Sequence, residues 1–249
     1  MSERDAPQLP KRFYTRVEVE ALASGAHVLL DGRAVKTPAK RPLVVPTVAL
    51  ARALGDEWDA QEDVIDPASM PLTRLANSTI DGVADSAEAV RDEIVKFASS
   101  DLLCYRATHP EGLKALQTER WDPLLQQVHE RMGARFLTSD GVMPVAQDGT
   151  ALDAVRNAIA TATPFALAAL HVVTTLTGSA LLAVLLEREA ISADAAWEAA
   201  HLDEDWQIAR WGEDHEAAVR RAGRLAEFQA AVRMLALSKE GAPAGDVAP

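Results

Sequence analysis

Twenty-three consecutive residues, from Pro164 to Leu186, carry no formal charge, and this run constrains the fold more than any other stretch of the chain. Its length would be sufficient for one helix that spans a bilayer. However, several threonines and a histidine interrupt the run, Gly178 and Ser179 lie in its second half, and no cluster of Lys or Arg flanks it. We therefore expect two buried helices joined at residues 177–179, with Ser179 or Thr177 capping the second. Helices that are apolar all round lie inside a bundle, so this pair predicts the core of a helical domain.

The N-terminal part of the chain has the pattern of a small β module. Residues 13–45 contain short runs in which apolar and polar residues alternate, and Asp31-Gly32 lies between two of these runs. Asp-Gly supplies the positive φ angles that a type I′ turn needs, so a β-hairpin is expected at this pair. The stretch RPLVVP adds a further short strand. After it the period changes to that of helices, and Pro46 is expected at the first helical position.

The remainder of the chain has helical periodicity, with two irregular points. Ser86 is expected to cap a helix that carries Ile94 on its apolar face. A later helix contains Pro123, which is expected to break or kink it near Asp122. The stretch RFLTSDGVMPV is expected to be extended, with a hairpin as one option.

These patterns together predict an α+β fold, with a small β-rich N-terminal domain followed by a larger all-helical C-terminal domain. We expect a flexible tail at 1–11, a β-rich domain at 12–46 that can extend to about 65, a helical domain at 66–238 and a flexible tail at 239–249.

Composition narrows the class of partner and the compartment. The net charge of −12 argues against nucleic acid as the main partner. The only cysteine, Cys104, excludes an internal disulfide framework and any multi-cysteine zinc site, and it fits a reducing compartment. The N-terminus MSERDAPQLPKRF has no apolar region of a secretory signal, so a cytoplasmic location without membrane insertion is expected.

The stretch LDEDWQIARWGED, residues 202–214, contains five carboxylates and two tryptophans. If one helix runs on from Ser192, steps of three and four place Glu204 in the same stripe as Trp197, Ile208 and Trp211, whereas the two neighbouring aspartates point away from it. A carboxylate on an apolar stripe is costly unless it is paired or hydrogen-bonded. Glu204 is therefore expected to act in catalysis, to contact a partner, or to form a structural salt bridge with an arginine of a neighbouring helix.

Motifs of catalysis, metal binding and cofactor binding are weak in this chain. His201 and Glu204 have the i, i+3 spacing of di-iron bundle ligands, but no other histidine offers a matching pair. No G-x-S-x-G motif and no glycine-rich phosphate loop is present, and Cys104 lies in an apolar, helix-like context. We expect no catalytic residue, no metal and no cofactor, and a hydrolase centred on Glu204 stays open as the alternative function.

A series of short motifs makes the chain resemble a known family. In chain order these motifs are LLDGRAVKTPAKRPLVVP, EWDAQ, MPLTRLANSTID, DLLCYRA, WDPLL, GVMPVAQ, LTGSALLAVLLE and LDEDWQIARWGED. Their order and spacing resemble the assembly chaperones for the alpha subunit of the F-type ATP synthase head, over about residues 12–237.

The resemblance implies a function as well as a fold. It implies a monomeric molecular chaperone, not an enzyme, that binds the unassembled alpha subunit, shields its subunit interface from aggregation and supports assembly of the catalytic head. It places the functional motif at LDEDWQIARWGED with Glu204 at its centre. The expected partner-binding residues are Asp203, Glu204, Asp205, Trp206, Ile208, Trp211 and Asp214.

Overall fold

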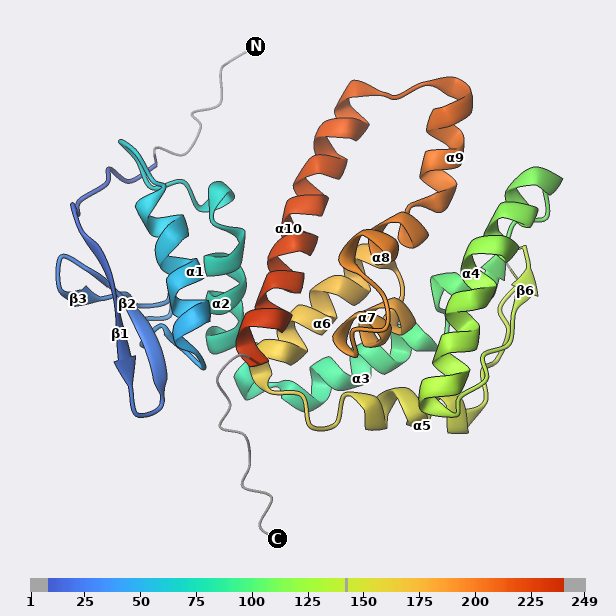
Figure 1. Ribbon diagram of the computed structural model, residues 1–249, viewed down its shortest axis with the longest axis horizontal. Helices are drawn as coiled ribbons and strands as arrows, with labels where there is room; N and C mark the ends of the chain where they lie inside the picture. The colour runs from blue at the N-terminus through green and yellow to red at the C-terminus, as the bar shows by residue number, and fades with distance from the viewer. Residues whose placement is uncertain (1–8, 142, 240–249) are drawn as a thin grey trace, which may run out of the picture. The chain divides into compact units, whose positions relative to one another are not determined.

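The computed structural model describes residues 9–141 and 143–239 of the chain (Figure 1). Backbone contacts divide the chain into two compact units, an N-terminal unit of Met1–Asp85 with Arg233–Pro249 and a helical unit of Ser86–Val232. This division differs from the expected boundary at 46–65, because two helices belong to the same unit as the strands. Most of the expected tails, residues 1–8 and 240–249, lies outside the described residues.

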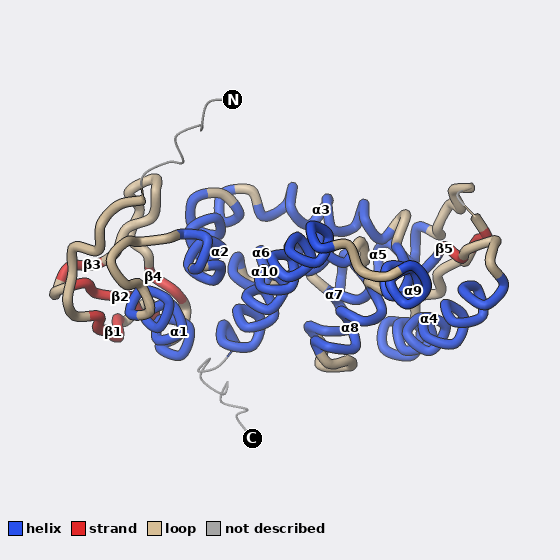
Figure 2. The backbone as a smooth tube through the Cα atoms, turned by 90° about the horizontal axis from the view of Figure 1, so that it is seen from above, coloured by secondary structure: helices blue, strands red, loops and turns tan. Residues whose placement is uncertain are grey.

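A small antiparallel sheet forms the base of the N-terminal unit. Its strands are β1 (Val17–Leu22), β2 (Gly25–Leu30), β3 (Arg33–Ala34) and β4 (Val44–Val45), in the order β1-β2-β3, with β4 also pairing β2. Every second side chain of β2 is buried, as expected for a strand with one face on the core. Within residues 9–141 and 143–239, the other strands are the short pair described below (Figure 2).

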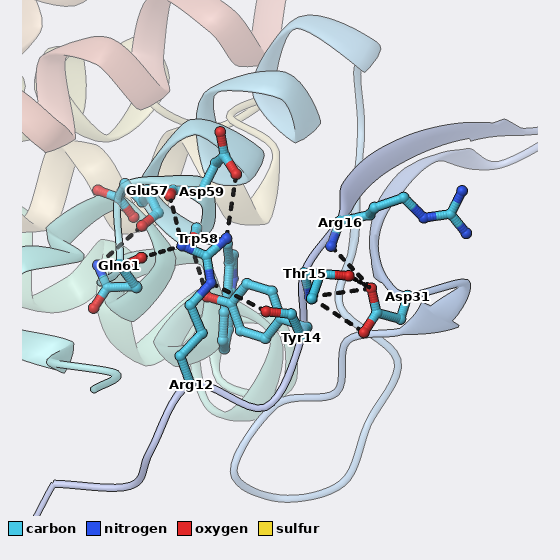
Figure 3. A network of polar contacts seen from close by, with 9 residues as sticks. All are labelled: Arg12, Tyr14, Thr15, Arg16, Asp31, Glu57, Trp58, Asp59 and Gln61. Carbon is cyan, nitrogen blue, oxygen red and sulfur yellow. Dashed lines mark hydrogen bonds and ion pairs between the residues drawn. The ribbon is translucent and has the colours of Figure 1, made fainter. Parts of the chain in front are cut away.

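The predicted hairpin at Asp31-Gly32 is confirmed. Leu30 pairs with Arg33, and the two residues between them have φ angles of 47° and 76°, as a type I′ turn requires. The Asp31 carboxylate also accepts hydrogen bonds from the backbone N–H groups of Arg16 (2.9 Å) and Thr15 (3.1 Å) (Figure 3). These bonds, that from Arg16 first, hold the pKa of Asp31 below its ordinary value.

Helix α1 (Val48–Asp59) packs on the sheet, and its two ends are fixed by side chains. Thr47 is the N-cap, since its hydroxyl accepts from the N–H of Leu50 (3.0 Å). The prediction that Pro46 occupies the first helical position is therefore wrong by two residues. At the other end, the Arg12 guanidinium donates to the carbonyl oxygens of Asp59 (3.1 Å) and Gln61 (Figure 3).

Helix α2 (Pro71–Asp81) follows a 3-10 turn, Pro67–Ser69. The carboxylate of Glu57, in α1, accepts hydrogen bonds from the N–H groups of Leu72 (2.8 Å) and Thr73 (2.7 Å), which lie in the first turn of α2. Because the first N–H groups of a helix have no partner within it, Glu57 supplies the acceptors that α2 lacks. A second 3-10 turn, Val83–Asp85, ends this part of the unit.

The helical unit contains eight helices within the described residues. They are α3 (Ala87–Ala98), α4 (Glu111–Met132), α5 (Gly149–Ala158), α6 (Pro164–Thr177), α7 (Ala180–Glu187), α8 (Ala193–Ala200), α9 (Leu202–Trp211) and α10 (His215–Lys239). The last turns of α10, from Arg233, are counted with the N-terminal unit. Ser86 is the N-cap residue of α3, as predicted.

The uncharged run forms two helices, as predicted. Gly178, with φ 68°, ends α6, and the hydroxyl of Ser179 accepts from the N–H of Leu182 (3.0 Å) at the start of α7. Every residue from Ala180 to Leu186 is buried, and α7 contacts α3, α4, α5, α6 and α8. Among the described residues, no helix is both long enough and apolar enough to cross a membrane.

Two predictions about local structure are corrected. Helix α4 runs through Pro123 and packs on α7, so the expected break is wrong, and the kink stays a prediction. Among the described residues of the stretch at 135–145, no hairpin is formed. Its strand β6 (Ser139–Asp140) pairs in parallel with β5 (Tyr105–Arg106), which follows the 3-10 turn Leu102–Cys104.

The side chain of Asp101 joins two distant segments in the core of the helical unit. It is fully buried and accepts from the Ser179 hydroxyl (2.6 Å) and from the N–H groups of Leu181 (3.0 Å) and Leu103 (3.1 Å). Burial raises its pKa from 3.8 to about 6, although these hydrogen bonds oppose the rise.

We expect Gly32→Val to destabilise the protein by about 1 kcal/mol or more, because a β-branched residue is strained at a positive φ. An added Cβ would meet no atom within 4 Å, so the effect comes from the backbone alone. The control is Gly223→Ala in α10, which also meets nothing and should stabilise slightly. Thermal unfolding measures both, and an unchanged melting temperature for Gly32→Val would contradict the turn.

The raised pKa of Asp101 predicts a pH dependence of stability. Between pH 3.8 and about 6 the unfolded state releases the proton first, so the stability that protonated Asp101 contributes is lost as pH rises through this window. The shift corresponds to roughly 3 kcal/mol. As pH rises across this window, the unfolding free energy of the wild type should fall by this amount relative to that of Asp101→Asn. Urea unfolding at several pH values tests this, and a difference independent of pH would exclude it.

Candidate partner-binding site

The stretch singled out in the sequence forms helix α9 and its connection to α10, all within the helical unit (Figure 1). One continuous helix from Ser192 is wrong, because the chain leaves helical geometry at His201 (φ −109°, ψ 15°) between α8 and α9. The His201 ring stacks on Trp197 with centroids 3.7 Å apart, and both side chains are buried. Burial also lowers the pKa of His201. Trp197 is therefore a core residue and does not continue the stripe of Glu204.

The three acidic residues in the first turn of α9 have different surroundings. Asp203 accepts from the side-chain amide of Gln117 in α4 (2.7 Å). Asp205 forms an ion pair with Arg221 of α10 at 2.5 Å, whereas Glu204 lies 4.0 Å from the same nitrogen and keeps 38 % of its side chain exposed. Asp205 does not simply point away, as the helical spacing predicted. The structural salt bridge considered for Glu204 is thus made mainly by Asp205, which is the closer partner of Arg221.

The two tryptophans of the motif also differ. The Trp206 ring packs on Gly112 of α4, where an added Cβ would lie 2.8 Å from the ring, and the Arg210 guanidinium lies 3.3 Å over it. Trp211, at the end of α9, is 76 % exposed. Ile208 lies between them along the helix and is half-buried. The fold therefore accounts for the position of Trp206 and not for the exposure of Trp211.

The connection between α9 and α10 is short and closely defined. Gly212, with φ 86°, lets the chain leave α9, since this backbone conformation strains other residues. The Asp214 carboxylate accepts from the N–H of Ala217 (2.8 Å) and so caps the start of α10. The two helices run antiparallel on either side of this connection (Figure 1).

A hollow of about 230 Å³, here called the hairpin hollow, lies between the end of α9 and the start of α10. Its walls include Glu204, Ile208 and Trp211 from α9, Glu213 and Asp214 from the connection, and Ala217, Ala218 and Arg221 from α10. Asp205 holds the pKa of Arg221 above its ordinary value, so the guanidinium is firmly charged. The hollow combines an apolar wall, an exposed indole and an excess of carboxylates.

A second hollow, of about 430 Å³, lies between α4, α8 and α9. Leu116, Leu124 and Leu202 contribute apolar surface to it, and Asp205 lies at its α9 side. Helix α9 thus has a hollow on each of two sides, and the Asp205–Arg221 pair connects the residues that line them.

Most family-like motifs of the sequence are engaged with one another inside the fold. Thr37 donates to Asp81 (2.6 Å), Asp101 binds Ser179, and Arg106 forms an ion pair with Asp122 (2.7 Å). Each of these contacts joins two different motifs. In LDEDWQIARWGED, by contrast, Glu204, Trp211 and Glu213 border the hairpin hollow with exposed surface.

Sequence reasoning missed three residues that hold the site together, namely Gln117, Gly112 and Arg221. Arg221 lies in the sequence RRAGR, and nothing in its spacing distinguishes it from the arginines beside it. Gly112 carries only a weak signal. Glycine weakens a helix, so a glycine in the first turn indicates that another group approaches the backbone closely.

The site contains acids, an indole and one paired arginine, but no nucleophile next to a base. Among the residues that the structure describes, no three histidine, cysteine or acidic side chains are grouped so that they can hold a metal ion. Cys104 is buried, and burial raises its pKa to about 12, so it is a core residue. The arrangement is suited to holding another protein surface.

Comparison with known proteins gives consistent matches. The sequence model of the family described as ATP12 chaperone protein matches residues 11–129. Protein atp12, mitochondrial, from Schizosaccharomyces pombe is 24 % identical over 219 residues, which cover 83 % of this chain and 75 % of the relative.

Two solved structures have the same fold. Atp12 from Paracoccus denitrificans has a TM-score of 0.87 and 41 % identity, and the match covers 92 % of this chain and 99 % of that one. The Atu1473 protein from Agrobacterium tumefaciens has a TM-score of 0.90 and 49 % identity, over 93 % of this chain and 87 % of that one. The expected α+β fold and the expected family are thereby confirmed, and the chain belongs to the ATP12 chaperone family.

Proposed function

We propose that this chain binds the unassembled alpha subunit of F-type ATP synthase, as a monomer, and shields the surface that later contacts the beta subunit. An unassembled subunit exposes a large apolar interface, and such a surface aggregates. A protein that covers it needs apolar and aromatic contacts surrounded by charge. Membership of the ATP12 chaperone family, together with the α9–α10 hairpin, supports this function.

The observation that carries the proposal is the exposure of Trp211 beside an excess of carboxylates. Large aromatic side chains at a protein surface are frequent sites of tight partner contact. Trp211 is 76 % exposed, and Glu204, Glu213 and Asp214 lie in the walls of the hollow that it borders. An acidic rim of this kind guides encounter with a basic surface. Of the seven residues expected to bind the partner, we assign direct contact to Glu204, Ile208 and Trp211. The other four, Asp203, Asp205, Trp206 and Asp214, support the site through their contacts inside the helical unit.

The first prediction concerns the state of the partner. Co-expression with the alpha subunit should give a complex of the two proteins on size-exclusion chromatography. Assembled catalytic heads should not bind, because the beta subunit then occupies the contact surface. Equal binding to free alpha subunit and to intact heads would contradict the shielding function.

The second prediction separates binding from folding at adjacent acids. Glu204→Gln should weaken binding to the alpha subunit by about 2 kcal/mol or more, as for a charge lost from a desolvated contact. Its melting temperature should change little, because Arg221 keeps its closer partner, Asp205. Glu204→Lys should abolish binding through repulsion of a basic partner surface.

The matched control is Asp205→Asn, one residue further on. It removes the 2.5 Å ion pair with Arg221 and should lower stability by about 1 kcal/mol, a value limited by the exposure of Asp205. Thermal unfolding and a binding titration are measured on all three variants. Wild-type affinity in both Glu204 variants would exclude the binding role, and a large loss of melting temperature in Glu204→Gln would make the residue structural.

A further inference from the structure

The two tryptophans of α9 are equivalent in chemistry but not in their partners. Trp206 is covered by the guanidinium of Arg210 at 3.3 Å, a cation–π contact formed within the chain. Trp211, five residues later, is 76 % exposed, and no Lys or Arg stacks on it within residues 9–141 and 143–239. The indole face of Trp211 therefore lacks a stacked cation such as the one that Arg210 provides to Trp206.

The charge of the hairpin hollow favours a cation over an anion. Glu204, Glu213 and Asp214 contribute three carboxylates to its walls, against one cation, Arg221. That cation is already held by a fourth carboxylate, Asp205, at 2.5 Å. A positively charged group that enters the hollow is therefore attracted, and an acidic group is repelled.

The apolar wall of the hollow selects among cations. Ile208, Ala217 and Ala218 line a space of about 230 Å³, which matches a long aliphatic stem better than a bare ion. A guanidinium is planar, stacks on an aromatic ring and binds a carboxylate through two parallel N–H groups, whereas an ammonium is compact and strongly hydrated. Arginine fits both the Trp211 face and the acidic rim.

We propose that the hairpin hollow receives an arginine side chain of the partner protein, with its guanidinium stacked on Trp211 and paired with Glu213 or Glu204. The identity of the partner rests on the proposed function, whereas the recognition of arginine follows from the hollow itself. The contact reproduces, between two proteins, the one that Arg210 and Trp206 make within α9.

The first experiment does not need the alpha subunit. The indole N–H resonance of Trp211 is followed by NMR while the protein is titrated with the peptide acetyl-Ala-Arg-Ala-amide. The control peptide carries citrulline, which has the shape of arginine but no charge. We expect a saturable shift with the arginine peptide, a much weaker one with the citrulline peptide, and a reduced shift in Glu213→Gln. No shift, or equal shifts with both peptides, overturns the proposal.

The second experiment uses the free alpha subunit. Trp211→Leu keeps an apolar side chain but removes the aromatic face, so binding should weaken about tenfold, as expected for a lost cation–π contact. Trp211→Phe keeps an aromatic face and should bind within about threefold of wild type. Phe13→Leu, at a 71 % exposed aromatic residue of the N-terminal unit, is the control and should bind as wild type does.

The outcomes of the two experiments separate the two proposals. If wild type does not bind the alpha subunit but the arginine peptide still shifts Trp211, the proposed function fails and the arginine site stands. If wild type binds alpha subunit and Trp211→Leu binds as tightly as Trp211→Phe, the partner contact is merely apolar and the arginine proposal fails. Self-association of the wild type that Trp211→Leu abolishes would show a second copy of the chain as the occupant, and would also overturn the proposal.

Discussion

The buried carboxylate of Asp101 fixes the start of α7, and five other helices of the helical unit, α3, α4, α5, α6 and α8, pack on α7. Its acceptors satisfy the Ser179 hydroxyl and the N–H of Leu181, which begin that helix, and the N–H of Leu103 in the turn after α3. Because all of these groups are buried, each would be costly without a partner. A single side chain therefore sets the positions of two segments that lie about eighty residues apart.

The same need to satisfy buried and helix-end polar groups explains why the motifs of this chain match those of the family in order and spacing. Glu57 of EWDAQ supplies acceptors to the first turn of α2 in MPLTRLANSTID, and Gln147 of GVMPVAQ exchanges two hydrogen bonds with the backbone of Leu137. Such contacts are between polar groups at helix ends and loops, where only specific residue types satisfy the backbone. Most of the resemblance is thus a resemblance of architecture, which is why it identifies the fold so well.

The α9–α10 hairpin is different, because the fold does not use all of its characteristic residues. Asp203, Asp205, Trp206 and Asp214 have defined contacts inside the helical unit. Trp211, Glu204 and Glu213 border a hollow and keep exposed surface. Under the proposed function, the exposed indole of Trp211 is the part of this motif that contacts the partner protein. The division between internal and outward residues within one motif is the strongest guide to its function.

The sequence by itself determined those features that depend on local physics. The positive φ of Asp31-Gly32, the two helices of the uncharged run and the cap at Ser179 follow from the turn chemistry, hydrophobicity and hydroxyl position of neighbouring residues. The family followed from motifs read in order. What only the tertiary structure decided are the contacts between distant residues.

The features that only the structure decided also include the break at His201, where the ring stacks on Trp197, and the unbroken course of α4 through Pro123. They also include the choice of Asp205 instead of Glu204 as the closer partner of Arg221. Helical spacing assigns a residue to a face, but which arginine of another helix meets that face depends on how the helices pack. For this reason the sequence located the candidate site, and only the packing of α9 on α4 and α10 distinguished the residues that hold it from those that remain free to bind.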